Sequence, residues 1–122
     1  VPFFICEGRE MDKGMGMKVL SSYKNGRLTL YFKGELDHHS ARNVMETIDQ
    51  LIDEYLPRDC VMELSGLTFM DSSGIAVILR VYKRMNEMGG RAWAENPRRQ
   101  PMKVIDASGI DRIVKISTTM KE

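Results

Sequence analysis

The stretch GLTFMDSSGIAVILRVYKRM, residues 66–85, places two kinds of pattern next to each other. Its first part continues an apolar run that is typical of a buried strand. Its last part carries apolar residues at the spacing of an amphipathic helix, which we expect to run from residue 72 or 73 to about residue 88. Asp71-Ser72-Ser73-Gly74 lies between them. The sequence therefore predicts a strand that ends where a helix begins.

The predicted helix in this stretch should bury one side and expose the other. The apolar residues expected on the buried side are Ile75, Ile78, Leu79, Tyr82 and Met85. The glycine pair at positions 89 and 90 is expected to end the helix, because glycine readily adopts the left-handed conformation found after helix ends.

The residues before this stretch predict two paired strands, a helix and a third strand. Residues 28–34, LTLYFKG, alternate between apolar and polar, and Asn25-Gly26 is a strong hairpin signal that pairs them with a strand around residues 18–23. A helix is expected from Ser40, as its N-cap, to the break at Pro57. Residues 60–64, CVMEL, should form a central strand.

The residues after it predict a short strand at 91–95, then a loop at 96–101, NPRRQP, and a third helix that ends near Gly109. Residues 111–117 fit either a strand or a helix. Strands separated by helices should be parallel. We therefore predict an α/β fold, a single mixed sheet of about four or five strands with about four helices packed mainly on one face.

The composition fits one globular domain and gives little net charge. The chain has 122 residues, with 18 basic and 17 acidic side chains and a net charge of +1. This balance gives no general attraction to nucleic acid or to an anionic membrane. The longest uninterrupted apolar run, residues 75–79, is far too short to span a bilayer. We expect a cytoplasmic protein with no nucleic-acid or membrane partner.

The domain is expected to cover residues 17–118, where the strand and helix patterns lie. Residues 1–16 carry no such pattern, and we expect them to be a tail or a cloning remnant outside the fold. Cys6 and Cys60 show no metal-ligand spacing, and Cys60, inside an apolar run, is predicted to be a buried free thiol.

The segment GELDHHSAR, residues 34–42, could suggest a metal site because His38 and His39 stand beside Glu35 and Asp37. Adjacent side chains point in different directions, however, and the chain has no third histidine. We therefore predict no metal site. The segment is interpreted as a strand-to-helix loop, or as a charged surface that a partner could contact.

Three roles are open for the serines of MDSSG. A nucleophilic serine needs a base, and the flanks lack the G-x-S-x-G pattern, which disfavours hydrolysis. A helix N-cap needs only one side-chain oxygen, whereas Asp71, Ser72 and Ser73 supply three. A phosphate on one serine would lie at a helix N-terminus, where unpaired amides favour negative charge, so a modification site is the third hypothesis.

Four segments in order, FKGELDHHSA, LTFMDSSGIAVILRVYKRM, GGRAWAEN and VIDASGIDRIVKI, resemble the anti-sigma factor antagonists of bacteria, and among them the sporulation type. The resemblance covers about residues 17–116. It implies the STAS domain fold and a protein that is not an enzyme and needs no cofactor. Its partner would be an anti-sigma factor that is also a serine kinase bound to ATP or ADP.

The resemblance also implies a switch. The unphosphorylated form would bind the kinase and release the sigma factor, phosphorylation on Ser72 would end that binding, and a PP2C-type phosphatase would reverse it. The partner-binding residues implied are Gly34, Glu35, Asp37, His38, His39, Asp71, Ser73, Gly74 and Ile75. A STAS signalling scaffold, or a small-ligand or nucleotide-binding module in another pathway, is the alternative, and no residue names the sigma factor.

The predicted topology agrees with this assignment. Asp37 and Asp71 each follow the carboxyl end of a predicted strand. Loops at the carboxyl ends of neighbouring parallel strands share one edge of the sheet, which is the usual place for function in such folds.

Overall fold

The computed structural model describes residues 5–6 and 16–118. The elements in chain order are β1 (Ile5–Cys6), β2 (Met17–Lys24), β3 (Arg27–Leu36), α1 (His38–Tyr55), β4 (Asp59–Met70), α2 (Ser72–Glu87), β5 (Arg91–Glu95), α3 (Arg99–Ser108), the 3-10 turn η1 (Ile110–Arg112) and β6 (Ile116–Ser117).

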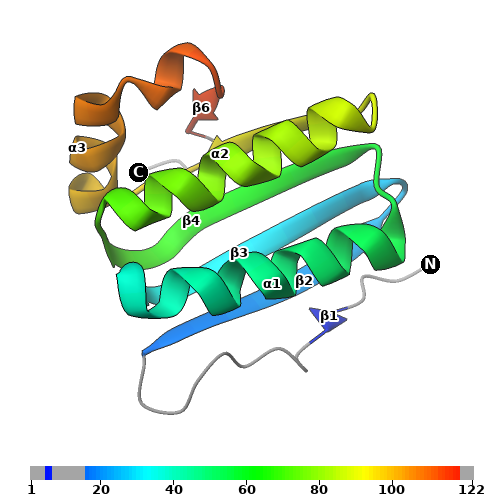
Figure 1. Ribbon diagram of the computed structural model, residues 1–122, viewed down its shortest axis with the longest axis horizontal. Helices are drawn as coiled ribbons and strands as arrows, with labels where there is room; N and C mark the ends of the chain where they lie inside the picture. Colours follow the sequence, from blue (N-terminus) through cyan, green and yellow to red (C-terminus); the bar gives the residue numbers. More distant parts are fainter. Residues whose placement is uncertain (1–4, 7–15, 119–122) are drawn as a thin grey trace.

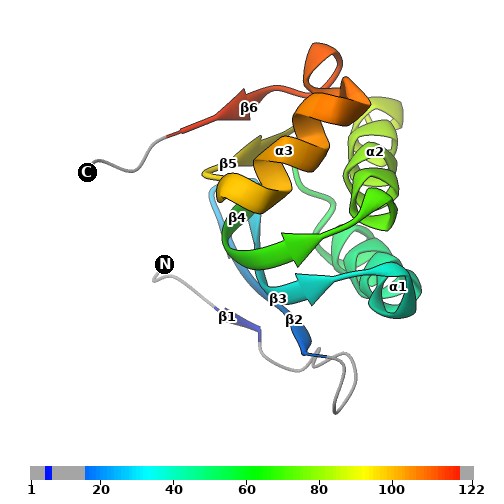
Figure 2. The ribbon, with the colours of Figure 1, turned by 90° about the vertical axis from the view of Figure 1, so that its left-hand side faces the viewer.

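The strands form one sheet in the order β1-β2-β3-β4-β5-β6. The β1–β2 and β2–β3 pairs are antiparallel, and the other three are parallel. Helices α1 and α2 lie side by side over one face of the sheet (Figures 1 and 2). The expected α/β class is confirmed. The sheet has more strands than expected because two-residue strands, β1 and β6, pair at its edges.

The hairpin between β2 and β3 turns at Asn25 and Gly26, which have φ values of 54° and 82°. Two consecutive residues with positive φ match the right-handed twist of a hairpin, which is why this dipeptide predicted the turn correctly. The central strand β4 is longer than the CVMEL segment, because its pairing with β3 continues past two register shifts to Met70.

The core lies between the sheet and the two helices. Leu28, Leu30 and Phe32 of β3 alternate toward the helices and are almost completely buried. The buried side of α2 differs from the expected one. It consists of Gly74, Val77, Ile78, Val81 and Met85, whereas Ile75, Leu79 and Tyr82 are only partly buried. Helix α2 has apolar residues on two adjacent stripes, and the stripe with the smaller side chains packs closest to the sheet.

Two residues of the expected N-terminal tail belong to the sheet. Ile5 and Cys6 pair with Ser22 and Ser21 at the edge of β2. Residues 1–4 and 7–15 lie outside the described residues, and the domain boundary at residue 17 stays a prediction.

Cys60 is a buried free thiol, as the sequence predicts. Burial raises its pKa to about 12, because the thiolate would lose its hydration among apolar neighbours. The thiol therefore stays protonated at neutral pH and behaves as a small apolar side chain.

Gly34 lies at an irregularity in β3, where the register with β4 shifts between Gly34 and Glu35. Its φ is 105°, and a β carbon at this position would collide with the carbonyl of Gly16. That carbonyl accepts a hydrogen bond of 3.0 Å from the amide of Glu35. Glycine is thus required both by the backbone conformation and by the close approach of Gly16.

Gly34→Ala should therefore destabilise the protein more than the same replacement at a glycine that has a positive φ but no close neighbour. Gly89 is the matched control, since its φ is 78° and nothing lies within 4 Å of an added β carbon. We expect Gly89→Ala to cost roughly 1–2 kcal/mol and Gly34→Ala at least ~2 kcal/mol more in urea unfolding. Equal losses would show that the contact with Gly16 does not matter.

Candidate functional site

The two loops that the sequence predicts at one edge of the sheet do lie together. The register of β3 and β4 ends with Leu36 opposite Met70. The Asp71 amide then donates a hydrogen bond of 3.2 Å to the Leu36 carbonyl. The one-residue connections at Asp37, between β3 and α1, and at Asp71, between β4 and α2, are therefore joined at the carboxyl ends of the two strands.

Helix α1 begins one turn earlier than the sequence analysis expected, because Asp37 and not Ser40 is its N-cap. The Asp37 carboxylate accepts hydrogen bonds from the His39 and Ser40 amides at 3.0 and 3.1 Å. Ser40 is fully buried and completes a capping box, since its hydroxyl accepts a bond of 3.2 Å from the Asp37 amide. The prediction was wrong because the Asp37 carboxylate, three residues before Ser40, accepts the hydrogen bonds from the free amides of the first turn.

The pKa of Asp37 is lower than its ordinary value. Partial desolvation acts to raise it, but the hydrogen bonds from the Ser40 and His39 amides favour the charged form and outweigh that effect. The carboxylate is therefore ionised at neutral pH, and its charge helps to hold the start of α1.

Helix α2 begins in a similar way, with Asp71 as its N-cap. The Asp71 carboxylate accepts a hydrogen bond of 2.8 Å from the Ser73 amide, and its carbonyl accepts one of 2.9 Å from the Gly74 amide. Ser72 is the first residue of the helix, and its side chain is exposed. Its hydroxyl makes no hydrogen bond to another described residue. Capping therefore uses Asp71 and leaves the Ser72 hydroxyl accessible.

Gly74 sets the distance between the start of α2 and the end of β4. A β carbon at Gly74 would lie 2.6 Å from the sulfur of Met70, which is completely buried. The first turn of α2 can therefore pack directly on Met70 only because residue 74 has no side chain.

Gln100 of α3 holds the same end of β4, and the sequence analysis missed it. Its side-chain amide accepts a hydrogen bond of 2.8 Å from the Met70 amide and donates one of 3.0 Å to the Met70 carbonyl. The Arg98 guanidinium also donates to the Ser65 carbonyl at 2.8 Å. In the sequence these two residues are part of a basic, proline-rich segment, and nothing in that pattern indicates a contact with β4.

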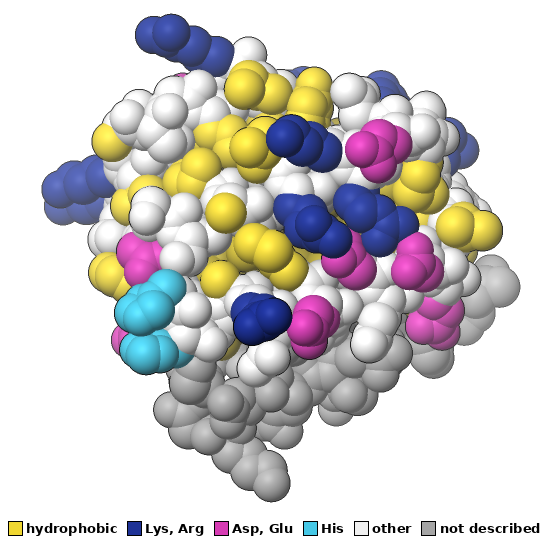
Figure 3. Space-filling view, in the orientation of Figure 1, with side chains coloured by type: hydrophobic (Ala, Val, Ile, Leu, Met, Phe, Trp, Pro, Cys, Tyr) yellow, Lys and Arg dark blue, Asp and Glu magenta, His cyan; other side chains and the backbone are white. Residues whose placement is uncertain are grey.

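The other residues predicted at this edge are mostly exposed. Glu35, near the end of β3, and His38 and His39, the first two residues of α1, are exposed, and the two imidazole rings lie 4.0 Å apart between centroids. The two histidines mark this end of the molecule in Figure 3. Ile75, in the first turn of α2, is partly buried against the core. The described part of the chain holds no group of three metal-ligating side chains.

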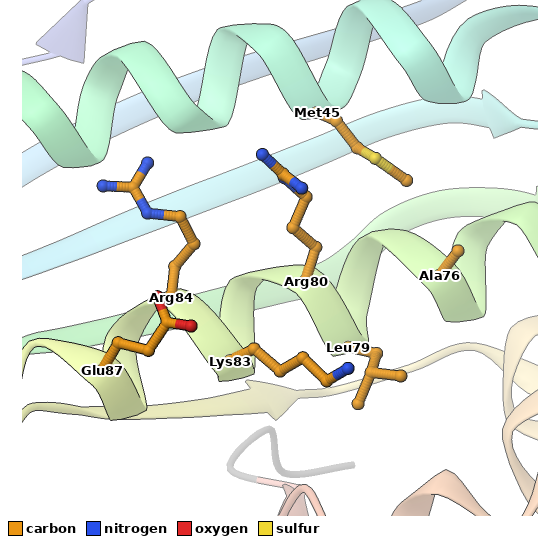
Figure 4. A pocket seen from close by; sticks show the side chains of 7 residues that line it. All are labelled: Met45, Ala76, Leu79, Arg80, Lys83, Arg84 and Glu87. Carbon is orange, nitrogen blue, oxygen red and sulfur yellow. The ribbon is translucent and has the colours of Figure 1, made fainter.

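A groove of about 400 Å³ runs between α1 and α2 on the outer face (Figure 4). Met45 of α1 and Ala76 and Leu79 of α2 supply its apolar lining. Arg80 and Arg84 point toward α1, where Arg80 donates to Asp49 at 2.8 Å and Arg84 donates to Asp53 at 2.7 Å. These ion pairs join the two helices and leave an apolar strip one turn beyond Ser72.

The STAS domain model matches residues 20–122. The chain therefore belongs to the STAS domain family. It is also similar to the anti-sigma F factor antagonist of Paenibacillus polymyxa, with 33% identity over 102 residues, which are 84% of this chain and 87% of that protein. The anti-sigma-B factor antagonist of Bacillus subtilis is 29% identical over 103 residues, 84% of this chain and 93% of that protein.

The fold agrees with these relationships. The solved structure of the anti-sigma factor antagonist SpoIIAA in its unphosphorylated form superposes with a TM-score of 0.73 at 23% identity, over 84% of this chain and 89% of that one. Because it is 33% identical to one of these antagonists over 84% of its length, the chain belongs to the anti-sigma factor antagonists, which are regulatory proteins and not enzymes. No helix in the described residues is long and apolar enough to cross a membrane.

Asp37→Ala should remove an N-cap whose contribution depends on pH. Because the folded state lowers the pKa of Asp37, the carboxylate stabilises the fold above its ordinary pKa of about 3.9, and this stabilisation is lost as the pH falls through the lowered value. We expect the variant to be about 1 kcal/mol less stable than the wild type at neutral pH. Below pH ~4 this difference in stability should become smaller, because the wild type then loses the contribution of the charged carboxylate. Chemical unfolding at several pH values measures both effects.

Asp106→Ala is the control for Asp37→Ala, since Asp106 is exposed on α3 and carries no cap. It should keep the acid dependence of the wild type. If Asp37→Ala kept the same dependence, the cap would not be the titrating interaction.

Gln100→Ala should leave the amide and carbonyl of Met70 without their partners. The expected loss is about 1–3 kcal/mol in urea unfolding, because both backbone groups lie at a partly buried position. Gln50→Ala, on the exposed side of α1, is the matched control and should change the stability by less than ~0.5 kcal/mol. Similar values for the two variants would contradict the role of Gln100.

Proposed function

We propose that this antagonist is controlled by phosphorylation of Ser72. Its partner is an anti-sigma factor that is also a serine kinase bound to ATP or ADP. The unphosphorylated chain binds this partner and releases the sigma factor, and the phosphorylated chain does not bind. The observation that supports this proposal is the exposed Ser72 hydroxyl, which is not used as a cap because the Asp71 carboxylate caps α2.

The position of Ser72 suits transfer of a phosphoryl group from ATP. A kinase must bring the γ-phosphate in line with an accessible hydroxyl oxygen. Ser72 lies at the first position of α2 on an end of β4 that Leu36 and Gln100 hold in place. Because the backbone at this end of β4 is held, the Ser72 side chain is presented to the kinase from a defined place, which favours the reaction.

The consequence of phosphorylation follows from charge. The phosphate adds roughly −1.5 to −2 charges next to Asp71, on an edge that already carries Glu35 and Asp37. The positive end of the helix dipole compensates by only about 0.3–1 kcal/mol. Because the caps of both helices remain intact, we expect the fold to stay unchanged. A partner that covers this edge would be repelled, since desolvation strengthens the interaction between like charges.

We propose that the partner binds residues at the same edge of the sheet as Ser72. Glu35, His38 and His39 are exposed and can contact the kinase directly, and Asp37, Asp71 and Ser73 hold the loops in position. Gly34 and Gly74 act through the backbone, and Ile75 extends the edge toward the apolar strip of the groove. The glycines and caps thus determine the shape of the proposed interface, and the exposed side chains determine its charge.

We propose further that a PP2C-type phosphatase reverses the modification in the cytoplasm and that the pathway controls sporulation. The similarity to an anti-sigma F factor antagonist supports the sporulation assignment. The matched test compares binding to the anti-sigma factors of the F and B classes. Tighter binding to the anti-sigma factor of the B class would contradict the sporulation assignment. It would not contradict the proposed switch at Ser72.

Ser72→Ala should abolish phosphorylation by the partner kinase with ATP. Mass spectrometry should show one added phosphate on the wild type and on Ser73→Ala, and none on Ser72→Ala. Ser73 is the matched control, as it is the neighbouring serine and its amide, not its hydroxyl, makes the capping bond. Phosphate retained by Ser72→Ala would assign the modification to another residue.

Ser72→Asp should weaken binding to the kinase at least about tenfold, because the added charge faces the partner. Ser72→Ala should bind like the wild type. Ala107→Asp adds the same charge on the exposed side of α3 and should not affect binding. Calorimetry of the three variants measures this, and equal affinity of Ser72→Asp and Ala107→Asp would disprove the charge mechanism.

A further inference from the structure

The amino ends of the parallel strands carry basic side chains, at the opposite end of β4 from Ser72. Lys24 is paired with Arg27, Arg27 with Asp59, and Asp59 with Arg91. These residues therefore cross the sheet side by side, from β2 to β5. With two neighbouring cations they form a surface that we call the basic row, which consists of Lys24, Arg27, Arg58, Arg91 and Lys115.

Two pockets open along the basic row, and Arg27 lines both. The first, of about 500 Å³, is also lined by Arg91 and Lys115 beside the edge of β5. The second, of about 460 Å³, is also lined by Lys24 and Arg58. Among the described residues, no acidic side chain lines either pocket. Because one residue lines both, the two pockets adjoin and form one hollowed cationic surface.

One buried carboxylate orients the arginines of the basic row. The Asp59 side chain is 1% exposed, and it forms ion pairs with Arg27 at 3.4 Å, Arg58 at 3.5 Å and Arg91 at 3.4 Å. One negative charge cannot neutralise three positive charges, and these arginine side chains remain 49%, 68% and 72% exposed. Their other N–H groups are therefore available to carboxylates from outside the chain, which guanidinium groups bind in a defined geometry.

An apolar wall lies beside these cations. The guanidinium carbons of Arg27 and Arg91 lie 5.0 and 5.7 Å from the centroid of the Trp93 ring. Tyr82 and Ile113 line the same pocket, and Ile113 is 55% exposed. A partner that places a carboxylate on the arginines can thus place an apolar side chain against this wall.

The edge of β5 adds a backbone donor. The Ala94 amide donates to the Lys115 carbonyl at 3.0 Å on the outer side of the strand. Because strand amides alternate in direction, the Ala92 amide points to the same side. Strand β6 pairs with β5 only at Ala94 and Glu95, so no strand in the described part of the chain pairs with Ala92. Ala92 also lines the first pocket, where its amide is a donor for an extended chain.

Acidic side chains limit the width of the basic row. Glu63 and Glu95 are paired with each other, and each lies four residues beyond Asp59 or Arg91 on the same face of its strand. At about 3.3 Å per residue, the cationic band is roughly 13 Å wide. A nucleic-acid duplex or a flat anionic membrane would also meet these glutamates. An extended peptide that lies along the row would not, which favours a peptide as the occupant.

We propose that the basic row binds an extended acidic segment of a partner protein. Its glutamates or aspartates contact the arginines, and an apolar residue lies against Trp93 and Ile113. About four or five residues span the row, because the three strand spacings from β2 to β5 measure roughly 14 Å. The site is separate from the Ser72 switch, since Asp59 begins β4 and Ser72 follows the end of that strand.

The probe is a peptide of about eight residues, long enough to cover the row, in which glutamates surround one phenylalanine. The control peptide has glutamine in place of every glutamate. Trp93 is the only tryptophan in the chain, so its fluorescence reports on the first pocket, and calorimetry detects binding that leaves the fluorescence unchanged. We expect saturable binding of the acidic peptide, at least about tenfold tighter than that of the control and weaker at higher salt.

Lys115→Glu should weaken the binding of the acidic peptide at least about tenfold, because it reverses a charge that faces the peptide. Lys24→Glu should do the same at the other end of the row. Neither lysine takes part in the ion pairs of Asp59, so the fold should be retained. Lys103→Glu makes the same change on the exposed side of α3 and should bind like the wild type.

Three results would contradict the proposal. The absence of saturable binding, or equal affinity of Lys115→Glu and Lys103→Glu, overturns the site. Wild-type affinity of Lys24→Glu overturns the binding of one segment along the whole row. Tighter binding of a DNA oligonucleotide, or of phosphatidylserine vesicles, than of the acidic peptide overturns the assignment of the partner to an acidic protein segment.

Discussion

The parallel pairing of β3 with β4 is the constraint on which the rest of the structure depends. It ends with Leu36 opposite Met70, and the bond from the Asp71 amide to the Leu36 carbonyl extends it by one residue. This bond brings together two helix starts that are 34 residues apart in sequence, at Asp37 and Asp71. Without this bond, the Asp37 cap of α1 and the exposed Ser72 of α2 would lie on two helices with no contact between their starts.

Rigidity at this edge decides what kind of switch Ser72 can be. The chain at Met70 is held by Gln100 on one side, and Gly74 allows α2 to pack directly on its side chain. The caps of both helices are carboxylates, so an added phosphate would not replace them. A modification at a fixed position changes the charge that a partner meets and not the conformation of the chain, which makes the interface the element that responds.

Local chemistry explains which features could be predicted from the sequence. The hairpin at Asn25-Gly26 and the change from strand to helix at Asp37 and Asp71 depend on neighbouring residues, and they were predicted correctly, although β4 continues six residues past the predicted CVMEL segment. The cap at Ser40 was misplaced because Asp37 and Ser40 are both good caps, and the choice between them depends on burial. Gln100 was missed, as were the ion pairs of the buried Asp59 with Arg27 and Arg91, because these contacts join residues about 30 positions apart and leave no local pattern.

Although the total charge of the chain is close to zero, acidic and basic side chains are separated along β4. Glu35, Asp37 and Asp71 lie at its carboxyl end, and the arginines around Asp59 lie at its amino end. From Asp59 to Met70 there are eleven residue steps, and at about 3.3 Å each they span roughly 36 Å. The screening length at physiological salt is only about 8 Å. A phosphate on Ser72 therefore cannot act through solvent on the arginines around Asp59, so its charge is felt only at the carboxyl end of β4.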